Sequence, residues 1–157
     1  MSQKIKLLNR KYSTNTAMLI VDSFIEIKDN GFVQELIMFE INHYRASKKI
    51  VILLDVFTLR GLSIAIINLI NDKDSKFKKF SQSKNSKKTL SIGKSSNKIF
   101  INLEKNDSSN NEHIKIEYIF GTLGAESFAM ELEEICSFTN NELFSTQKDM
   151  YAKGALR

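Results

Sequence analysis

One pattern occurs twice in this sequence and limits its fold more than any other feature: an apolar strand-like run, a short turn and an amphipathic helix. The first copy is KKIVILLDVFTLRGLSIAIINLIN, residues 48–71, and the second is HIKIEYIFGTLGAESFAMELEEI, residues 113–135. Their turns are also similar, FTLRG at 57–61 and FGTLG at 120–124. An amphipathic helix must bury its apolar stripe against another element. We therefore expect two copies of one unit, in which strands are followed by a helix.

Further strand signals precede the first copy. Residues 17–27 and 32–45 alternate apolar and polar side chains, the period of two that is typical of a half-buried strand. Asn30-Gly31 between them favours a hairpin turn, because both residues tolerate positive φ angles. With the strand at 48–54, these runs predict a three-stranded antiparallel meander covered by the helix that follows.

The second unit is expected over residues 89–144, with strands at 89–92, 98–103 and 113–120 and a helix over 125–143. The predicted class is α+β: two antiparallel β-meander-plus-helix units (βββα twice) in one pseudo-symmetric domain spanning 1–157. Residues 72–88 contain few large apolar side chains and are interpreted as an exposed basic linker between unit 17–71 and unit 89–144. Residues 1–16 are expected to be a loose arm or a short leading strand, and the role of the tail 145–157 stays open.

No catalytic or cofactor-binding motif is present in the sequence. It has no zinc-type Cys/His cluster, glycine-rich phosphate loop, HExxH or GxSxG. The single cysteine, Cys136, falls among helical apolar positions and is expected to be a buried small hydrophobe, in keeping with a reducing compartment. His43 and His113 are interpreted as ordinary strand or surface residues, and no acid–base pair is assigned to them. We expect a protein without enzymatic activity, cofactor or metal.

The apolar runs are far shorter than the roughly 20 residues that span a bilayer. The N-terminus MSQKIKLLNRKYS has charge but no apolar signal core. We therefore expect a cytoplasmic protein that does not associate with membranes.

Positive charge is concentrated in one part of the chain. The net charge is +5, but the segment 73–98 has nine lysines and one acid, so it carries +8 and the remainder carries −3. Lysines neutralise phosphates, and aromatic faces stack on bases. Phe77 and Phe80 lie within this segment, which indicates either a single-strand binding element or a solvated linker in a lysine-rich sequence.

The outer face of the first sheet is the second candidate site. It is expected to carry Met38, Asn42 and Tyr44, with basic residues at the adjoining turn. Such a face suits nucleobases and phosphates, but an ordinary sheet surface or a dimer interface fits it equally. The full set of predicted nucleic-acid-binding residues is Tyr44, Arg45, Lys48, Lys49, Lys76, Phe77, Lys78, Lys79, Phe80, Lys87, Lys88, Lys94 and Lys98.

The two strand–turn–helix passages give the sequence a resemblance to a known group. Antiparallel strands followed by a helix, repeated twice over roughly residues 17–143, are similar to the organisation of Whirly proteins and of the positive-cofactor-four-like single-stranded nucleic-acid binders. The resemblance implies single-strand binding on curved sheets, and assembly into homodimers or higher homo-oligomers through the helices. The tail string KGAL, residues 153–156, looks like the lysine-glycine-rich motif of plant Whirly proteins, but it follows the second helix and is assigned no role.

Two function classes are therefore kept. The first is a non-enzymatic single-stranded DNA (or RNA) binding protein that uses sheet aromatics and the lysine-rich segment, with low sequence specificity. The alternative is a protein–protein adaptor or a structural subunit of a secretion, conjugation or phage system, because fold alone does not fix function.

Overall fold

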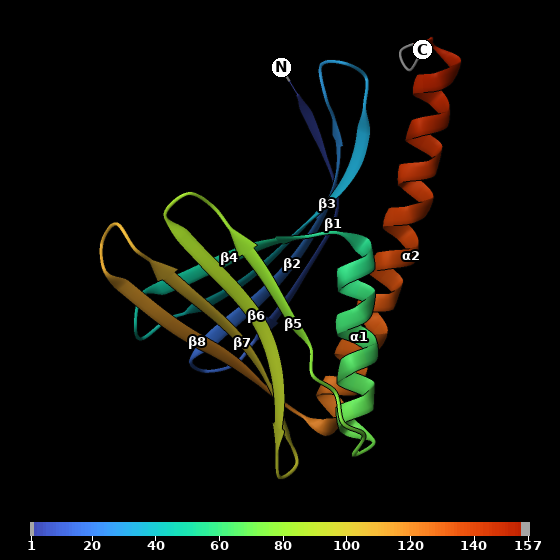
Figure 1. Cartoon of the computed structure of the whole chain (residues 1–157). Helices are drawn as coiled ribbons and strands as arrows, with labels where there is room; N and C mark the ends of the chain where they lie inside the picture. Colours follow the sequence, from blue (N-terminus) through green and yellow to red (C-terminus); the bar gives the residue numbers. More distant parts are fainter. Residues whose placement is uncertain (1, 155–157) are drawn as a thin grey trace.

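The computed structural model describes residues 2–154 and contains two four-stranded antiparallel sheets, each followed by a helix (Figure 1). Sheet A has the strand order β1-β2-β3-β4, and sheet B has the order β5-β6-β7-β8. The elements of the first unit are β1 (Gln3–Ser13), β2 (Ala17–Ile27), β3 (Val33–His43), β4 (Lys48–Leu54) and α1 (Val56–Ile70). Those of the second are β5 (Lys78–Gln82), β6 (Ser86–Ser95), β7 (Lys98–Asp107), β8 (Glu112–Gly121) and α2 (Thr122–Ala152).

The alternation in the sequence decides which face of sheet A is buried. Odd-numbered residues of β2 and β3 and even-numbered residues of β4 point inward, and most are almost fully buried. The register agrees, because Leu19 pairs with Ile41, and Ile41 pairs with Ile50. Side chains at alternate positions must point to opposite faces of a strand, so one register buries the whole apolar set.

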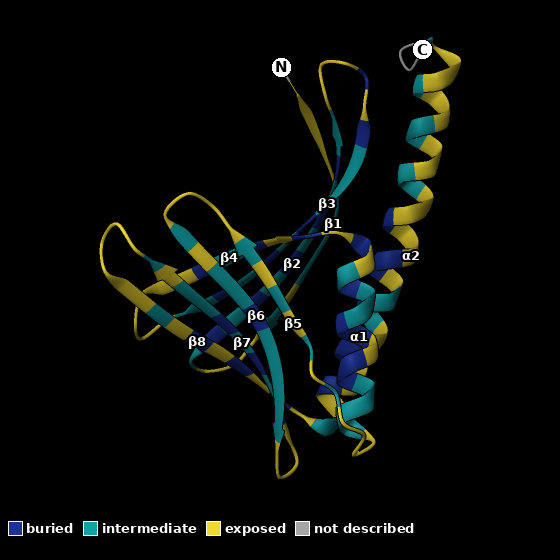
Figure 2. Ribbon diagram, viewed as in Figure 1, coloured by how far each residue is buried: buried dark blue, intermediate teal, exposed yellow. Residues whose placement is uncertain are grey.

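Sheet B repeats this arrangement. Leu90 on β6 pairs with Leu103 on β7, which pairs with Ile116 on β8, and all three are buried. The inner faces of both sheets and the inner sides of both helices share one apolar core (Figure 2). Three aromatic rings join its parts: Tyr12 of β1 meets Phe128 of α2 edge-on at 4.9 Å, and Phe128 stacks on Phe120 of β8 at 4.8 Å between centroids.

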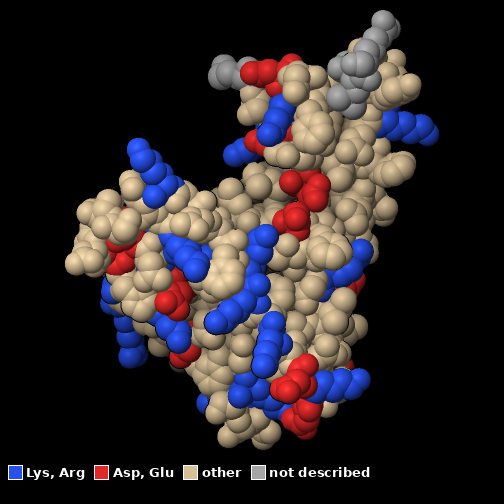
Figure 3. Space-filling model, viewed as in Figure 1, with Lys and Arg blue, Asp and Glu red and all other residues tan. Residues whose placement is uncertain are grey.

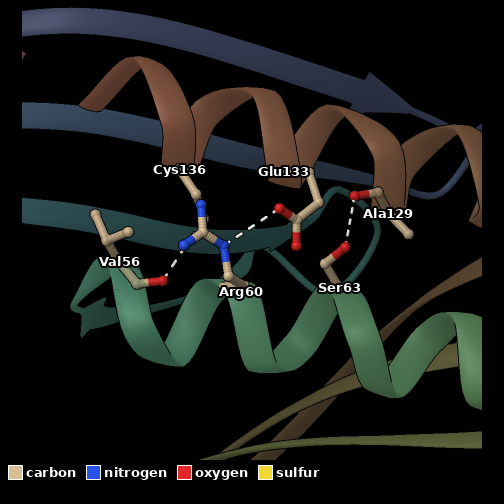
Figure 4. Close-up of polar contacts among 6 residues, drawn as sticks. All are labelled: Val56, Arg60, Ser63, Ala129, Glu133 and Cys136. Atoms are coloured by element: carbon tan, nitrogen blue, oxygen red, sulfur yellow. Dashed lines mark hydrogen bonds and ion pairs between the residues drawn. The ribbon is translucent and has the colours of Figure 1, made fainter. Parts of the chain in front are cut away.

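Polar contacts join the two helices where they pack against each other (Figure 4). Ser63 Oγ donates a hydrogen bond to the main-chain oxygen of Ala129 at 2.7 Å, and Arg60 Nε donates to Glu133 Oε2 at 3.2 Å. Cys136 Sγ lies 3.6 Å from the main-chain oxygen of Val56, and burial raises the pKa of this thiol to about 11. The expectation that Cys136 is a buried small hydrophobe is confirmed.

Asp55 fixes the start of α1. Its Oδ1 accepts a hydrogen bond from the main-chain N–H of Thr58 at 2.7 Å, as expected of an N-cap residue. Helix α2 has no such cap: Gly121 is its N-cap residue, and Thr122 is already helical. Among residues 2–154, no helix is long and apolar enough to cross a membrane.

The α+β class and the duplicated sheet-and-helix unit are confirmed, but each unit has one more strand than the sequence predicts. Of the two alternatives for the N-terminal residues, the leading strand is correct and the loose arm is wrong: residues 3–13 form β1, an eleven-residue edge strand paired along β2. The expected linker 72–88 contains β5 and the beginning of β6. Both extra strands are edge strands rich in lysine, so they lack the apolar run that identifies a buried strand. Main-chain hydrogen bonds pair each with its neighbour, and β1 also packs Leu8 and Tyr12 against the core.

Helix α2 is also longer than expected, because it continues to Ala152 instead of ending near residue 143. Most of the undecided tail is therefore helical, and Lys153 and Gly154 follow its end; residues 155–157 lie outside the described part of the chain. The additional turns project beyond α1 towards the β2–β3 hairpin (Figure 1). There Gln147 Nε2 donates to the main-chain oxygen of Val33 at 3.3 Å.

Candidate nucleic-acid interface

The outer face of sheet B is an open surface with aromatic, basic and polar side chains. Because Leu90, Ile101 and Ile116 point inward, the residues that alternate with them along β6, β7 and β8 point outward. The rows that cross the sheet on this side include Gln82, Lys87, Asn106 and His113; Phe80, Thr89, Glu104 and Lys115; Lys78, Ser91, Asn102 and Glu117; and Gly93, Phe100 and Ile119. Figure 3 shows basic side chains gathered over the region of β5 and β6.

Phe80 and Lys87 form the most distinctive contact on this face. The Lys87 Nζ lies 4.4 Å from the centre of the Phe80 ring, and Phe80 is 50% exposed. The two residues come from neighbouring strands, since Lys87 pairs with Gln82 and Phe80 with Thr89. An exposed aromatic ring beside an exposed cation can stack on a base and neutralise the adjacent phosphate.

Acidic groups interrupt the positive charge of the face. His113 Nε2 lies 2.7 Å from Glu104 Oε1, and this hydrogen bond holds the pKa of the Glu104 carboxyl below its ordinary value. Glu117 lies in the next row, beside Asn102. The face is therefore of mixed charge, and its basic part is the β5–β6 side.

A second basic group lies at the β3–β4 hairpin, where Tyr44, Arg45, Lys48 and Lys49 are all exposed. This hairpin lies beside the edge strand β8: His43 lines a shallow depression with Lys115 and Glu117. Burial first, and then the nearby Tyr44, raises the pKa of Tyr118 on β8. The hairpin group thus borders sheet B, although it belongs to sheet A.

Four of the predicted residues are turned towards the protein. Lys88 Nζ donates to the main-chain oxygen of Val51 on β4 at 2.7 Å, and Lys94 Nζ lies 2.5 Å from Asp72 Oδ1 beyond the end of α1. Phe77 packs on the core, with its ring 3.7 Å from the position that a Cβ on Gly61 would take. Lys79 faces the same side as Leu90, near enough to Asp55 to contribute to lowering the pKa of that carboxyl.

The remaining predicted residues are accessible. Lys76 is exposed in the connection between α1 and β5, and Lys78 and Lys98 are exposed on the outer side of sheet B. The structure therefore brings together Lys78, Phe80, Lys87 and Lys98 on one face, and Tyr44, Arg45, Lys48 and Lys49 at its border. Lys88, Lys94, Phe77 and Lys79 do not share that surface.

The outer face of sheet A has a different character. Its rows include Met18, Asn42 and Lys49, then Ile20, Glu40 and Val51, then Asp22, Met38 and Leu53. Asp22 is already engaged by the side chains of Asn9 and Lys6 of β1. The face thus mixes apolar and acidic side chains in its middle, and lysines of β1, Lys6 and Lys11, border it on one side.

Sequence reasoning missed two residues of the sheet B face, Phe100 and Lys115. In the run KIFINLE, Ile99, Ile101 and Leu103 are apolar at alternate positions, so Phe100 must lie on the opposite face. The same rule places Lys115 outward, between Ile114 and Ile116. The alternation of β7 and β8 is therefore the signal that could have found them.

An apolar stripe on the outer side of the helices was also missed. Leu123, Met130, Phe144 and Tyr151 of α2 lie at seven-residue intervals, with Ser137 in the series, and are 60–81% exposed. Phe57 and Ile64 of α1, again seven residues apart, are 88% and 54% exposed. A seven-residue spacing keeps side chains on one face of a helix, so the stripe is visible in the sequence once the length of α2 is known.

No cluster of metal-binding side chains occurs within residues 2–154. The two histidines have separate local contacts: His43 Nδ1 accepts from the main-chain N–H of Ala46 at 3.3 Å, and His113 contacts Glu104. The two histidines therefore contact different partners and are not hydrogen-bonded to each other.

Two antiparallel four-stranded sheets, each followed by a helix, around one core define a Whirly-like fold, as the resemblance implied. Among solved structures the chain is similar to WHY1 from Arabidopsis thaliana, at 15% identity and a TM-score of 0.59 over 84% of this chain and 90% of that one. It is also similar to WHY3 from Arabidopsis thaliana, at 12% identity and a TM-score of 0.63 over 96% and 98% of the two chains. A third similar structure is the plant transcriptional regulator PBF-2, at 15% identity and a TM-score of 0.61 over 92% and 87%.

The similarity is confined to structure. No protein-family model matches the sequence, and no curated protein sequence matches it significantly. At 12–15% identity the likeness establishes the fold, and it carries no binding residue from those proteins to this chain.

Proposed function

We propose that this protein is a non-enzymatic single-stranded DNA (or RNA) binding protein, and that the strand lies across the outer face of sheet B. The observation that carries the proposal is the exposed Phe80 ring with Lys87 4.4 Å from its centre. Lys78, Lys98 and Lys115 extend the basic surface on the same side. Tyr44 and Arg45 of the β3–β4 hairpin would contact the nucleic-acid strand where it passes beyond β8.

The energetics allow a base to reach the Phe80 ring. An exposed cation–π contact is worth about 0.5–1 kcal/mol. Stacking of a base on an aromatic side chain is worth about 1–3 kcal/mol and tolerates every base. A base would therefore displace the ammonium group of Lys87 from the ring and leave it to pair with the neighbouring phosphate. This predicts binding with little sequence preference on the open face.

The Whirly-like fold supports the proposal, because the resemblance implies single-strand binding on curved sheets. Unlike the face of a strongly basic binding protein, the outer face of sheet B also carries two acidic side chains, Glu104 and Glu117. We infer that binding is of moderate strength and that it weakens steeply with salt, since each released counterion contributes to the slope.

The test is fluorescence anisotropy with a labelled single strand and a labelled duplex of the same length, at two salt concentrations. The proposal expects binding of the single strand, weaker binding of the duplex, and a clear loss of affinity at the higher salt. Absence of single-strand binding at low salt overturns it and leaves the adaptor or structural-subunit alternative.

We further propose that copies of this chain assemble through the apolar stripe of the helices. Large exposed apolar side chains on one face of a helix favour burial against a protein surface. The seven-residue spacing of Leu123, Met130, Phe144 and Tyr151 is the pattern that a second helix can pack along. A homo-oligomer would leave the outer face of sheet B accessible, because that face and the stripe belong to different surfaces of the protomer.

A further inference from the structure

A pocket lies at the end of sheet B, beside the Phe80–Lys87 pair. It has a volume of about 310 Å³ and lies between the β5–β6 turn and the β7–β8 loop. Its polar lining includes Gln82, Lys84, Asn85, Asn106, Asn111 and His113. This volume is at the lower end of the range for small-molecule sites, which fits one nucleotide unit better than a large ligand.

Main-chain hydrogen bonds hold the two loops in place. The main-chain N–H of Ser108 donates to the main-chain oxygen of Asn85 at 2.8 Å, and Ser108 Oγ approaches the same oxygen at 3.1 Å. The β5–β6 turn is closed by the N–H of Ser83, which donates to the Ser86 oxygen at 2.9 Å. The pocket is therefore built by fixed backbone and does not depend on the placement of one loop alone.

The side-chain amides around the pocket are available to a ligand. Within residues 2–154, the amides of Gln82, Asn85 and Asn111 make no hydrogen bond to another side chain or to the backbone, and all three residues are exposed. The carboxylate of Asp107, in contrast, already accepts from the N–H and Oγ of Ser109. An amide offers a donor and an acceptor side by side, which matches the edge of a nucleobase.

Lys87 connects this pocket to the face where stacking is proposed, because it lines the pocket and also contacts the Phe80 ring. We propose that the pocket receives one unstacked nucleobase of a bound single strand, next to the base that stacks on Phe80, and reads its edge through the amides. The inference rests on the proposed function and deepens it. It adds a base preference at one position to a face that is otherwise tolerant of sequence.

The experiment compares labelled homopolymers of equal length, oligo-dT, oligo-dA and oligo-dC, by anisotropy. The proteins are the intact chain, the double variant Gln82→Ala/Asn85→Ala, and the matched control Asn140→Ala/Asn141→Ala on α2. A well-placed amide–base contact predicts at least about fivefold discrimination between homopolymers by the intact chain. The pocket variant should lose that discrimination while still binding the weakest homopolymer as before, and the control should keep it.

Two results overturn the inference while the proposed function stands: equal binding of all homopolymers by the intact chain, or unchanged discrimination in the pocket variant. Absence of binding to every homopolymer instead defeats the proposed function itself. Competition with dAMP, dTMP and dCMP, each titrated up to millimolar concentration, tests whether the pocket binds a base of a strand or a free nucleotide. Release of the labelled strand by one mononucleotide well below millimolar concentration would show that the pocket serves free nucleotides and would overturn the strand-based assignment.

Discussion

The Lys88 Nζ donates a hydrogen bond to the main-chain oxygen of Val51 at 2.7 Å, and this contact joins the two sheets. β4 is an edge strand of sheet A, so this oxygen has no partner strand on its outer side. Burial, followed by the nearby Lys105, lowers the pKa of Lys88, in keeping with an ammonium group withdrawn from water. Lys87, one residue earlier, faces the opposite side of the sheet and contacts Phe80.

This relationship predicts opposite outcomes for the two adjacent lysines. Lys88→Met should lower the free energy of unfolding by about 1–2 kcal/mol, because the Val51 oxygen loses its charged donor at a partly buried site. Lys87→Met should change stability by less than about 0.5 kcal/mol, as expected of an exposed residue. Urea denaturation of both variants measures the difference. Equal stability losses would contradict the structural role given to Lys88.

In oligonucleotide binding, Lys87→Met should have the larger effect and Lys88→Met the smaller. If Lys87 neutralises one phosphate of a single strand, Lys87→Met should reduce the slope of log K against log salt by roughly 0.7. Lys88→Met should leave the slope unchanged, because its ammonium group is held between the sheets. Salt titrations of a labelled oligonucleotide with the two variants provide the comparison, and a larger slope change in Lys88→Met would argue against a binding site on the outer face.

Removal of the aromatic ring tests the stacking contribution separately from charge. Phe80→Ala should weaken single-strand binding by about 1–3 kcal/mol, with the salt slope retained. Phe32→Ala is the matched control, since Phe32 is also 50% exposed and lies in the β2–β3 hairpin of sheet A. If both variants bind as well as the intact chain, Phe80 is not a stacking platform.

The cap of α1 predicts a dependence of stability on pH. Burial raises the pKa of Asp55, but hydrogen bonds from the side chain and main chain of Thr58 outweigh it, and the net pKa lies below the ordinary 3.8. The carboxylate therefore stabilises the fold above that value, and this contribution is lost as the pH falls through the lower folded-state pKa.

Asp55→Ala should accordingly lower the free energy of unfolding by about 1 kcal/mol at pH 7. The gap between the variant and the intact chain should narrow below about pH 4. Thermal unfolding across pH 3–7 is the measurement, with Asp149→Ala near the end of α2 as the control. A gap that stays constant down to pH 3 would show that the charge of Asp55 does not contribute to the cap.

Assembly through the helices has a direct test. Met130→Glu combined with Phe144→Glu should convert the assembled protein to a monomer in size-exclusion chromatography with light scattering, because two charges would have to be buried in the apolar contact. Ser145→Glu, an exposed position next to the stripe, should leave the mass unchanged. A monomeric intact chain would refute the assembly proposal at once.

The alternation along β2 and β3 predicted the buried face of sheet A from the sequence alone. Successive side chains of a strand point to opposite faces whatever the surroundings, so Leu19 and Ile41 could be assigned to the core without a structure. The repeated strand–turn–helix pattern predicted the two sheet-and-helix units, because the periodicity of a strand and that of a helix are both local features of the sequence.

Only the tertiary structure decided what the lysines do. β1 and β5 are held by backbone pairing with their neighbours, and hydrogen bonds between main chains leave no signal in side-chain pattern. Once β5 and β6 are paired, Lys87 and Phe80 are left on the open face, while Lys88 and Lys94 are turned to Val51 and Asp72. The sequence determined how much positive charge this segment carries. Strand pairing determined which part of that charge faces outward, because a shift of one residue exchanges the two faces of a strand.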